Sequence, residues 1–262
     1  MDDITTVLGV ILGLGVLFRL LYRTLCPRFA PKYIVDSDPF LLAFELTCVV
    51  PLAYCAFAGT HAWNYDLVTG FDTPEQRLFT PVPSASRNMI LVNAGFQLWD
   101  FIISLKHKEL NAPEMLLHHS LAAALCLVGL HLGFGQYYGL FFMGVTETSS
   151  LPLVYVDLNK FYPELYKRYP GRDLFAKVAF GMMFFVVRDY YFIKYSIQLW
   201  KDSFQVLDAG TAVYPMVTYG FLVTNLFFNA LQIFWTKLLL DGLVDILRGG
   251  SGNESVKTKK IE

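Results

Sequence analysis

The sequence predicts an all-α, multi-pass transmembrane helix bundle with about seven spans. The 262 residues are 55% hydrophobic and 16% aromatic but only 16% charged, which is more apolar than an ordinary soluble domain. Seven stretches approach the length of about 20 mostly apolar residues that a helix needs to cross a bilayer core about 30 Å thick. Basic residues are concentrated in alternate connecting segments, as expected of a chain that crosses the membrane repeatedly.

The predicted spans differ in regularity. Glu147 and Pro152 interrupt the fifth span, and only a few residues around Gly133 and Gly135 join it to the fourth, which predicts a tight helical hairpin. In chain order the predicted spans are 4–22, 40–58, 87–105, 115–132, 137–156, 174–199 and 211–239.

The distribution of Lys and Arg predicts the topology, because basic loops stay in the cytosol. With a lumenal N-terminus, the lumenal segments keep only Arg77 and Lys201. The acidic start Met1-Asp2-Asp3 agrees, and it argues against a cleaved signal peptide. We therefore expect a lumenal N-terminus and a cytosolic C-terminus. The cytosolic segments then collect Arg23, Arg28, Lys32, Lys106, Lys108, Lys160, Lys167, Arg168, Arg172, Arg248, Lys257, Lys259 and Lys260.

Composition also excludes several classes of function. The net charge of −1 gives no electrostatic case for nucleic-acid binding. The four cysteines lie in or beside apolar stretches without metal-ligand spacing, so we expect free thiols and no metal site. The sequence contains no nucleotide-binding loop and no serine nucleophile elbow, and no cofactor is predicted.

Polar side chains recur at helical spacing in two predicted spans. Such a stripe cannot face lipid, so two of them predict a cavity inside the bundle. The alternative is that these amides and hydroxyls only join helices through hydrogen bonds. The third span carries Asn93, Gln97, Asp100 and Ser104, and the seventh carries Thr218, Asn225, Asn229, Gln232 and Thr236.

The pair His118-His119 lies about one turn inside the cytosolic end of the fourth span, at a depth similar to that of Asp100. A carboxylate bonded to one imidazole nitrogen leaves the other nitrogen as a general base. Adjacent helical residues point about 100° apart, so one histidine at most faces a cavity while the other supports it. The alternative is an interfacial pair solvated from the cytosol.

Further ionisable groups lie deep in the fifth and sixth spans. Pro152 and the hydroxyls of Ser149 and Ser150 suggest a local bend around the Glu147 carboxylate. Arg188 is similarly deep in the sixth span, and an ion pair between Glu147 and Arg188 would neutralise both charges.

These motifs, taken in order, resemble the landmarks of the TLC domain, which is shared by translocating-chain-associating proteins, longevity-assurance ceramide synthases and the neuronal ceroid lipofuscinosis membrane protein. The resemblance covers roughly residues 86–247. Where the synthases have a His-Asp pair, this chain has Val145-Thr146-Glu147, so it is closer to the broader TLC-domain-containing proteins. The motifs are Trp99-Asp100, His118-His119, Glu147-Thr148-Ser149-Ser150-Leu151-Pro152, Val187-Arg188 and Gln232-Ile233-Phe234-Trp235-Thr236-Lys237.

The resemblance implies lipid metabolism or lipid homeostasis in the endoplasmic reticulum and a bundle that encloses a lipid chain. It also implies catalytic roles for His118 and His119, with Asp100 as an orienting acid and acyl-CoA as the co-substrate. Substrate-binding candidates are Asn93, Gln97, Glu147, Ser149, Ser150, Arg188, Asn225, Asn229 and Gln232.

Two functional hypotheses from different classes follow. The first is an acyl-CoA-dependent lipid acyltransferase that uses the histidine pair. The second is a non-catalytic lipid-binding regulator of membrane composition, or a cargo receptor of the reticulum. They differ in whether turnover depends on the two histidines. A transporter is a weaker third hypothesis, because the sequence has no internal repeat.

The predicted organisation has three parts. Residues 1–85 form two helices and a lumenal loop, residues 86–247 form a five-helix TLC-like domain, and residues 248–262 form a cytosolic tail. Lys259 and Lys260 of the tail resemble a dilysine retrieval signal, which implies recognition by coat proteins and residence in the endoplasmic reticulum membrane. The Asn253-Glu254-Ser255 sequon faces the cytosol in this topology and is expected to carry no glycan.

Overall fold

The computed structural model describes residues 3–66 and 69–247, which form helices and contain no strand. The retrieval signal at Lys259 and Lys260 and the Asn253 sequon lie outside the described residues. The α-helices are α1 (Asp3–Leu20), α2 (Cys26–Phe29), α3 (Lys32–Val35), α4 (Pro39–His61), α5 (Pro74–Phe79), α6 (Ser84–Ser104), α7 (Pro113–Leu132), α8 (Gln136–Phe142), α9 (Ser150–Phe161), α10 (Pro163–Arg168), α11 (Pro170–Met183), α12 (Phe192–Asp208) and α13 (Pro215–Leu247). Between them lie the π-helical segments η1 (Leu21–Leu25), η2 (Ala62–Asp66) and η4 (Phe184–Tyr191) and the 3₁₀ turn η3 (Val145–Thr148).

The predicted all-α class is confirmed, and each predicted span coincides with helical structure in the described residues. Four helices there are long and apolar enough to cross a membrane: Asp3–Phe29, Pro39–Asp66, Pro113–Leu132 and Pro215–Val244. The fifth predicted span is divided between the short helices α8 and α9 and the turn η3, and the third and sixth contain several of the polar residues named above. The number of crossings and the orientation of the termini therefore stay predictions.

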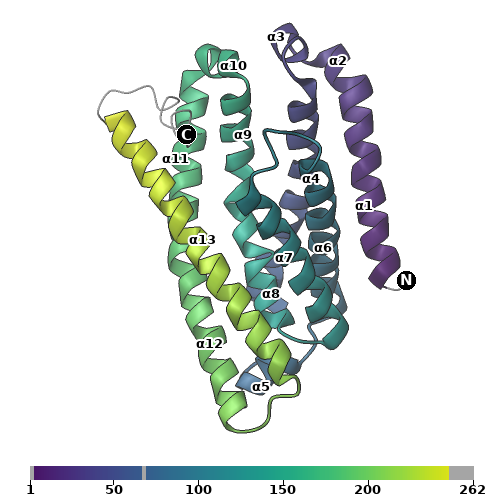
Figure 1. Cartoon of the computed structure of the whole chain (residues 1–262), viewed down its shortest axis with the longest axis vertical. Coiled ribbons are helices and arrows are strands. Elements are labelled where there is room, and N and C mark those ends of the chain that lie inside the picture. The colour runs from purple at the N-terminus through teal and green to yellow at the C-terminus, as the bar shows by residue number, and fades with distance from the viewer. Residues whose placement is uncertain (1–2, 67–68, 248–262) are drawn as a thin grey trace.

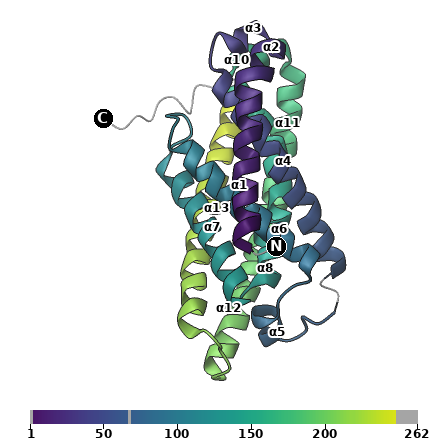
Figure 2. The ribbon, with the colours of Figure 1, turned by 90° about the vertical axis from the view of Figure 1, so that its right-hand side faces the viewer.

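The long helices run side by side along the longest axis of the molecule, with α1 at one edge and α12 and α13 at the opposite edge (Figure 1). The short helices α2, α3 and α10, which carry several of the basic residues counted above, gather at one end (Figures 1 and 2). The short helix α5, which carries Arg77, lies at the other end. The arrangement thus separates the two sets of connecting segments that the charge count assigns to opposite sides.

Helix α6 lies in the middle of the bundle, and α1, α4 and α7 pack against it. On α1 the large apolar residues Ile4, Leu8, Leu12 and Val16 are exposed at a spacing of four, which places them on one helix face. A continuous exposed apolar stripe is what a lipid-facing helix surface requires. The other face of α1 is held to α6 by an ion pair between Asp3 and Arg87.

Two glycine positions explain the irregular fifth span. Gly133 ends α7 and Gly135 precedes α8, both with positive φ, of 66° and 64°, which forms the short turn between these helices. Further on, Gly144 packs directly on Gly59 of α4, where a Cβ on Gly59 would lie 2.5 Å from the Gly144 Cα. This backbone contact separates α8 from η3 and places Glu147 in a short 3₁₀ turn.

Candidate functional site

The bundle encloses an amphipathic cavity between α6, α7, α8, η3, η4, α12 and α13. The empty space in it, counted together with the part that opens to the outside, is about 870 Å³. His118 and Gly129 both line it, and Gly129 follows His118 by eleven positions of α7, or about 16 Å along the helix axis. The charged residues Glu147 and Arg188 line it together with His118. The end at Gly129 is lined by the rings of Phe134 and Phe221, with centroids 4.7 Å apart, and by Gln136, which donates a hydrogen bond of 3.2 Å to the Gly129 carbonyl.

His118 is the histidine of the pair that lines the cavity. Among the described residues its Nδ1 atom is buried and has no hydrogen-bond partner. Edge-on contacts hold its ring, with ring centroids 5.2 Å from Phe228 and 5.6 Å from Trp235 of α13. An imidazole nitrogen that is buried without a protein partner is left for a group outside the described chain to satisfy.

His119 faces α6 and is not part of the cavity lining. Its Nδ1 lies 2.6 Å from Oε1 of Gln97, a residue that does line the cavity. Its Nε2 lies 3.4 Å from Oδ1 of Asp100, which accepts a hydrogen bond of 2.8 Å from Ser104. Asp100 therefore lies next to His119 and not beside His118. The 3.4 Å between Asp100 and His119 is longer than a usual N–H···O bond.

Glu147 and Arg188 form the expected ion pair in the cavity wall, with 3.7 Å between the carboxylate and the guanidinium. Ser150 bridges them, since it donates to Glu147 at 2.7 Å and accepts from Arg188 at 3.0 Å. Ser149 accepts a second bond from Arg188 at 2.7 Å. Both charges are thus compensated within the protein, and the bends around η3 and η4 bring them together.

Helix α13 contributes two amides to the cavity. Asn225 is tied to α12, because it accepts a hydrogen bond from Trp200 and donates one to Ser196, each of 3.0 Å. Gln232 is 1% exposed and lines the cavity, and its Oε1 has no hydrogen-bond partner among the described residues. Phe228 lies one turn before it on the same face of α13.

The other predicted site residues serve helix packing in this structure. Asn93 is fully buried and donates a hydrogen bond of 2.9 Å to the carbonyl of Met143, which joins α6 to the segment after α8. Asn229 donates to Ser196 at 3.0 Å and joins α13 to α12. The following predicted candidates do not line the cavity: Asn93, Asp100, His119, Ser149, Ser150 and Asn229.

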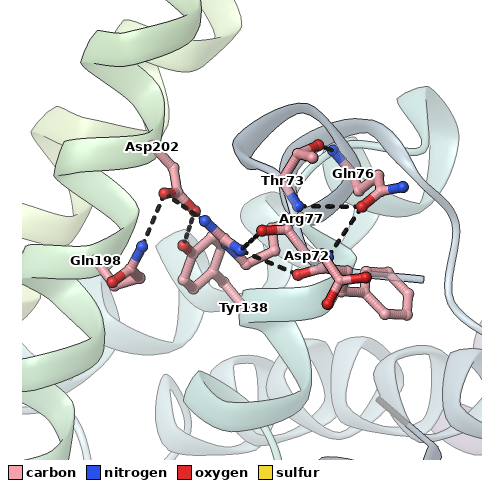
Figure 3. A network of polar contacts seen from close by, with 8 residues as sticks. Asp72, Thr73, Gln76, Arg77, Tyr138, Gln198 and Asp202 are labelled. Atoms are coloured by element: carbon pink, nitrogen blue, oxygen red, sulfur yellow. Dashed lines mark hydrogen bonds and ion pairs between the residues drawn. The ribbon is translucent and has the colours of Figure 1, made fainter. Parts of the chain in front are cut away.

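One polar network escaped the sequence analysis. Asp202 of α12 is buried and pairs with Arg77 of α5 through two contacts of 2.6 and 2.9 Å, while Tyr138 and Gln198 also donate to it (Figure 3). This hydrogen bonding raises the pKa of Arg77 above its ordinary value. The network holds α5 and α12 against the cavity residue Tyr138. The only sequence signal was Arg77 itself, one of the two basic residues in the predicted lumenal segments.

Fold and site together define a multi-pass helical membrane protein with a partly polar internal cavity. A family model described as the TLC domain (TRAM_LAG1_CLN8) matches residues 40–241, so the chain belongs to the TLC-domain family. This match includes α4 as well as most of the segment 86–247. No curated protein and no solved structure matches the chain significantly.

Proposed function

We propose that this TLC-domain protein binds a lipid in the cavity beside His118 and transfers an acyl group from acyl-CoA to it. The observation that carries the proposal is the unpartnered Nδ1 of His118, a residue in the lining of a cavity that has both polar and apolar walls. Family membership is consistent with a lipid-related role.

The shape of the cavity favours an amphipathic ligand. The wall below His118 is largely apolar and includes Leu125, Phe142, Phe192 and Leu199. Burying an alkyl chain against such a surface is favourable by about 0.8 kcal/mol for each CH₂ group. The polar groups around His118 would then meet the head of the lipid, near the end of the bundle that the topology prediction assigns to the cytosol.

The proposed reaction needs one base. The acceptor's O–H or N–H gives its proton to the His118 imidazole while its oxygen or nitrogen attacks the thioester carbonyl of acyl-CoA. The carbon–sulfur bond breaks, and the leaving thiolate takes the proton back from His118. Gln97 and His119 act as positioning residues, because their hydrogen bond fixes the wall next to His118.

The second candidate function is non-catalytic lipid binding that regulates membrane composition. It is favoured by the distance of Asp100 from His118, since the carboxylate approaches only His119. Either function is proposed for the endoplasmic reticulum, on the basis of the family's lipid-related roles and the predicted signal at Lys259 and Lys260. Replacing both lysines with serine should release the protein to later compartments.

The decisive experiment uses the full-length protein in nanodiscs with isotope-labelled acyl-CoA and a membrane lipid extract. Wild type, His118→Ala and the control His131→Ala, an exposed histidine on the same helix, are compared by lipid mass spectrometry. Labelled product from wild type and His131→Ala alone supports the acyltransferase. Bound lipid without labelled product supports the regulator, and neither lipid nor product refutes the proposed function.

A further inference from the structure

Two cavity residues, His118 and Gln232, present buried polar atoms that have no hydrogen-bond partner in the described chain. They are Nδ1 of His118 and Oε1 of Gln232. A buried acceptor without a partner costs free energy, so such atoms in a cavity wall mark where a ligand is to supply hydrogen bonds. The chemistry of these two atoms therefore indicates which hydrogen-bonding groups the head of the ligand must carry.

His118 and Gln232 come from α7 and α13, which pack against each other. Phe228, Gln232 and Trp235 occur at positions i, i+4 and i+7 of α13 and therefore share one helix face. The rings of Phe228 and Trp235 flank the ring of His118 at centroid distances of 5.2 and 5.6 Å. Gln232 lies between these two contacts, which places it beside His118.

Charge narrows the class of ligand further. Glu147 and Arg188 are the charged residues among those that line the cavity, and they neutralise each other. A carboxylate or phosphate would enter without an uncommitted cation, and an ammonium would enter without an uncommitted carboxylate. Both would be buried charges without a partner, which is strongly unfavourable. A neutral head avoids this cost.

We infer that the acceptor lipid is a neutral single-chain lipid with two hydroxyl groups, of the monoacylglycerol type. One hydroxyl donates to Nδ1 of His118 and the other to Oε1 of Gln232, which satisfies both unpartnered acceptors at once. A base must be unprotonated, so His118 Nδ1 accepts and cannot itself satisfy Gln232. Gln232 is thereby a specificity-determining residue. The inference rests on the proposed function and names its substrate class.

Competition for a photoreactive monooleoylglycerol probe tests this inference on the full-length protein in nanodiscs. The competitors are 1-monooleoylglycerol, oleyl alcohol, oleylamine and oleic acid, which share one chain and differ in the head. We expect monooleoylglycerol to compete about tenfold more strongly than oleyl alcohol, and the amine and the acid to compete more weakly still. Equal or stronger competition by the amine or the acid would overturn the inference.

The variant Gln232→Leu isolates the second hydrogen bond. It should lower the affinity for monooleoylglycerol about tenfold and leave that for oleyl alcohol unchanged. Gln205→Leu, at an exposed position of α12, is the matched control and should change neither. An equal loss for both lipids in Gln232→Leu would contradict the inference.

Acyl transfer to oleyl alcohol as fast as to monooleoylglycerol would overturn the inference while leaving the proposed function intact. Absence of any competition would overturn the inference but not the proposed function, which leaves the acceptor open and is tested by the labelled acyl-CoA experiment.

Discussion

Nδ1 of His119 lies 2.6 Å from Oε1 of Gln97, and Gln97 lies between this histidine and the cavity that His118 lines directly. Neighbours in the sequence therefore have different surroundings. His118 meets the cavity and the aromatic rings of α13, whereas His119 is held within the α6–α7 interface.

The two histidines should contribute unequally to acyl transfer. His118→Asn removes the proposed base and should lower kcat by at least about a hundredfold. His119→Asn and Gln97→Leu alter only the hydrogen bond that positions the cavity wall next to His118. Each should lower kcat by about tenfold with KM little changed. Steady-state kinetics with labelled acyl-CoA measures both parameters. Equal losses in His118→Asn and His119→Asn would contradict the assignment of His118 as the base.

The ion pair between Glu147 and Arg188 should be required for folding. Glu147→Gln leaves the guanidinium uncompensated within the bundle, which we expect to cost about 3–5 kcal/mol. The exchange Glu147→Arg with Arg188→Glu should recover part of the loss. Yield of monodisperse protein and its melting temperature test this prediction. If the exchange is no better than either single change, the pair does not stabilise the fold.

The network around Asp202 should stabilise the end of the bundle that carries α5. Arg77→Leu leaves the Asp202 carboxylate, whose side chain is 3% exposed, without its cation and should cost about 3–5 kcal/mol. Lys201→Leu changes the exposed neighbour of Asp202 and serves as the control. Thermal unfolding followed by circular dichroism compares them. A variant Arg77→Leu as stable as the control would show that the network contributes little.

The contact between Gly59 and Gly144 should tolerate no side chain. A Cβ on Gly59 would overlap the backbone of Gly144, which cannot move away as a side chain would. We expect Gly59→Ala to destabilise the protein by about 1–3 kcal/mol. At Gly9 of α1 an added Cβ meets nothing within 4 Å, so Gly9→Ala is the control. Comparable unfolding temperatures for the two variants would contradict this packing.

Local sequence patterns predicted the helices well, because apolar runs and their interruptions determine where a chain can be helical in a membrane. They also predicted that one histidine at most would face a cavity, since adjacent helical residues diverge by about 100°. Which one does so depends on the packing of α13 against α7, and no local pattern specifies that contact.

Long-range partners were the part that the sequence could not predict. Arg77 and Asp202 are separated by 125 positions, and each alone is an ordinary charged residue near the end of a helix. Asn93 belongs to a convincing polar stripe, yet its amide bonds the Met143 carbonyl and does not reach the cavity. A polar stripe shows which helix face avoids lipid, but only tertiary packing decides between a cavity and a neighbouring backbone.

Native mass spectrometry of the purified protein tests most directly whether the cavity holds a lipid. Ala122 is buried and lines the cavity, so Ala122→Phe should fill it, whereas Ala124→Phe places the same ring on the exposed face of α7. For variants that remain helical and monodisperse, we predict a bound lipid of the same mass in wild type and Ala124→Phe and its loss in Ala122→Phe. Retention of that lipid in Ala122→Phe would contradict the account.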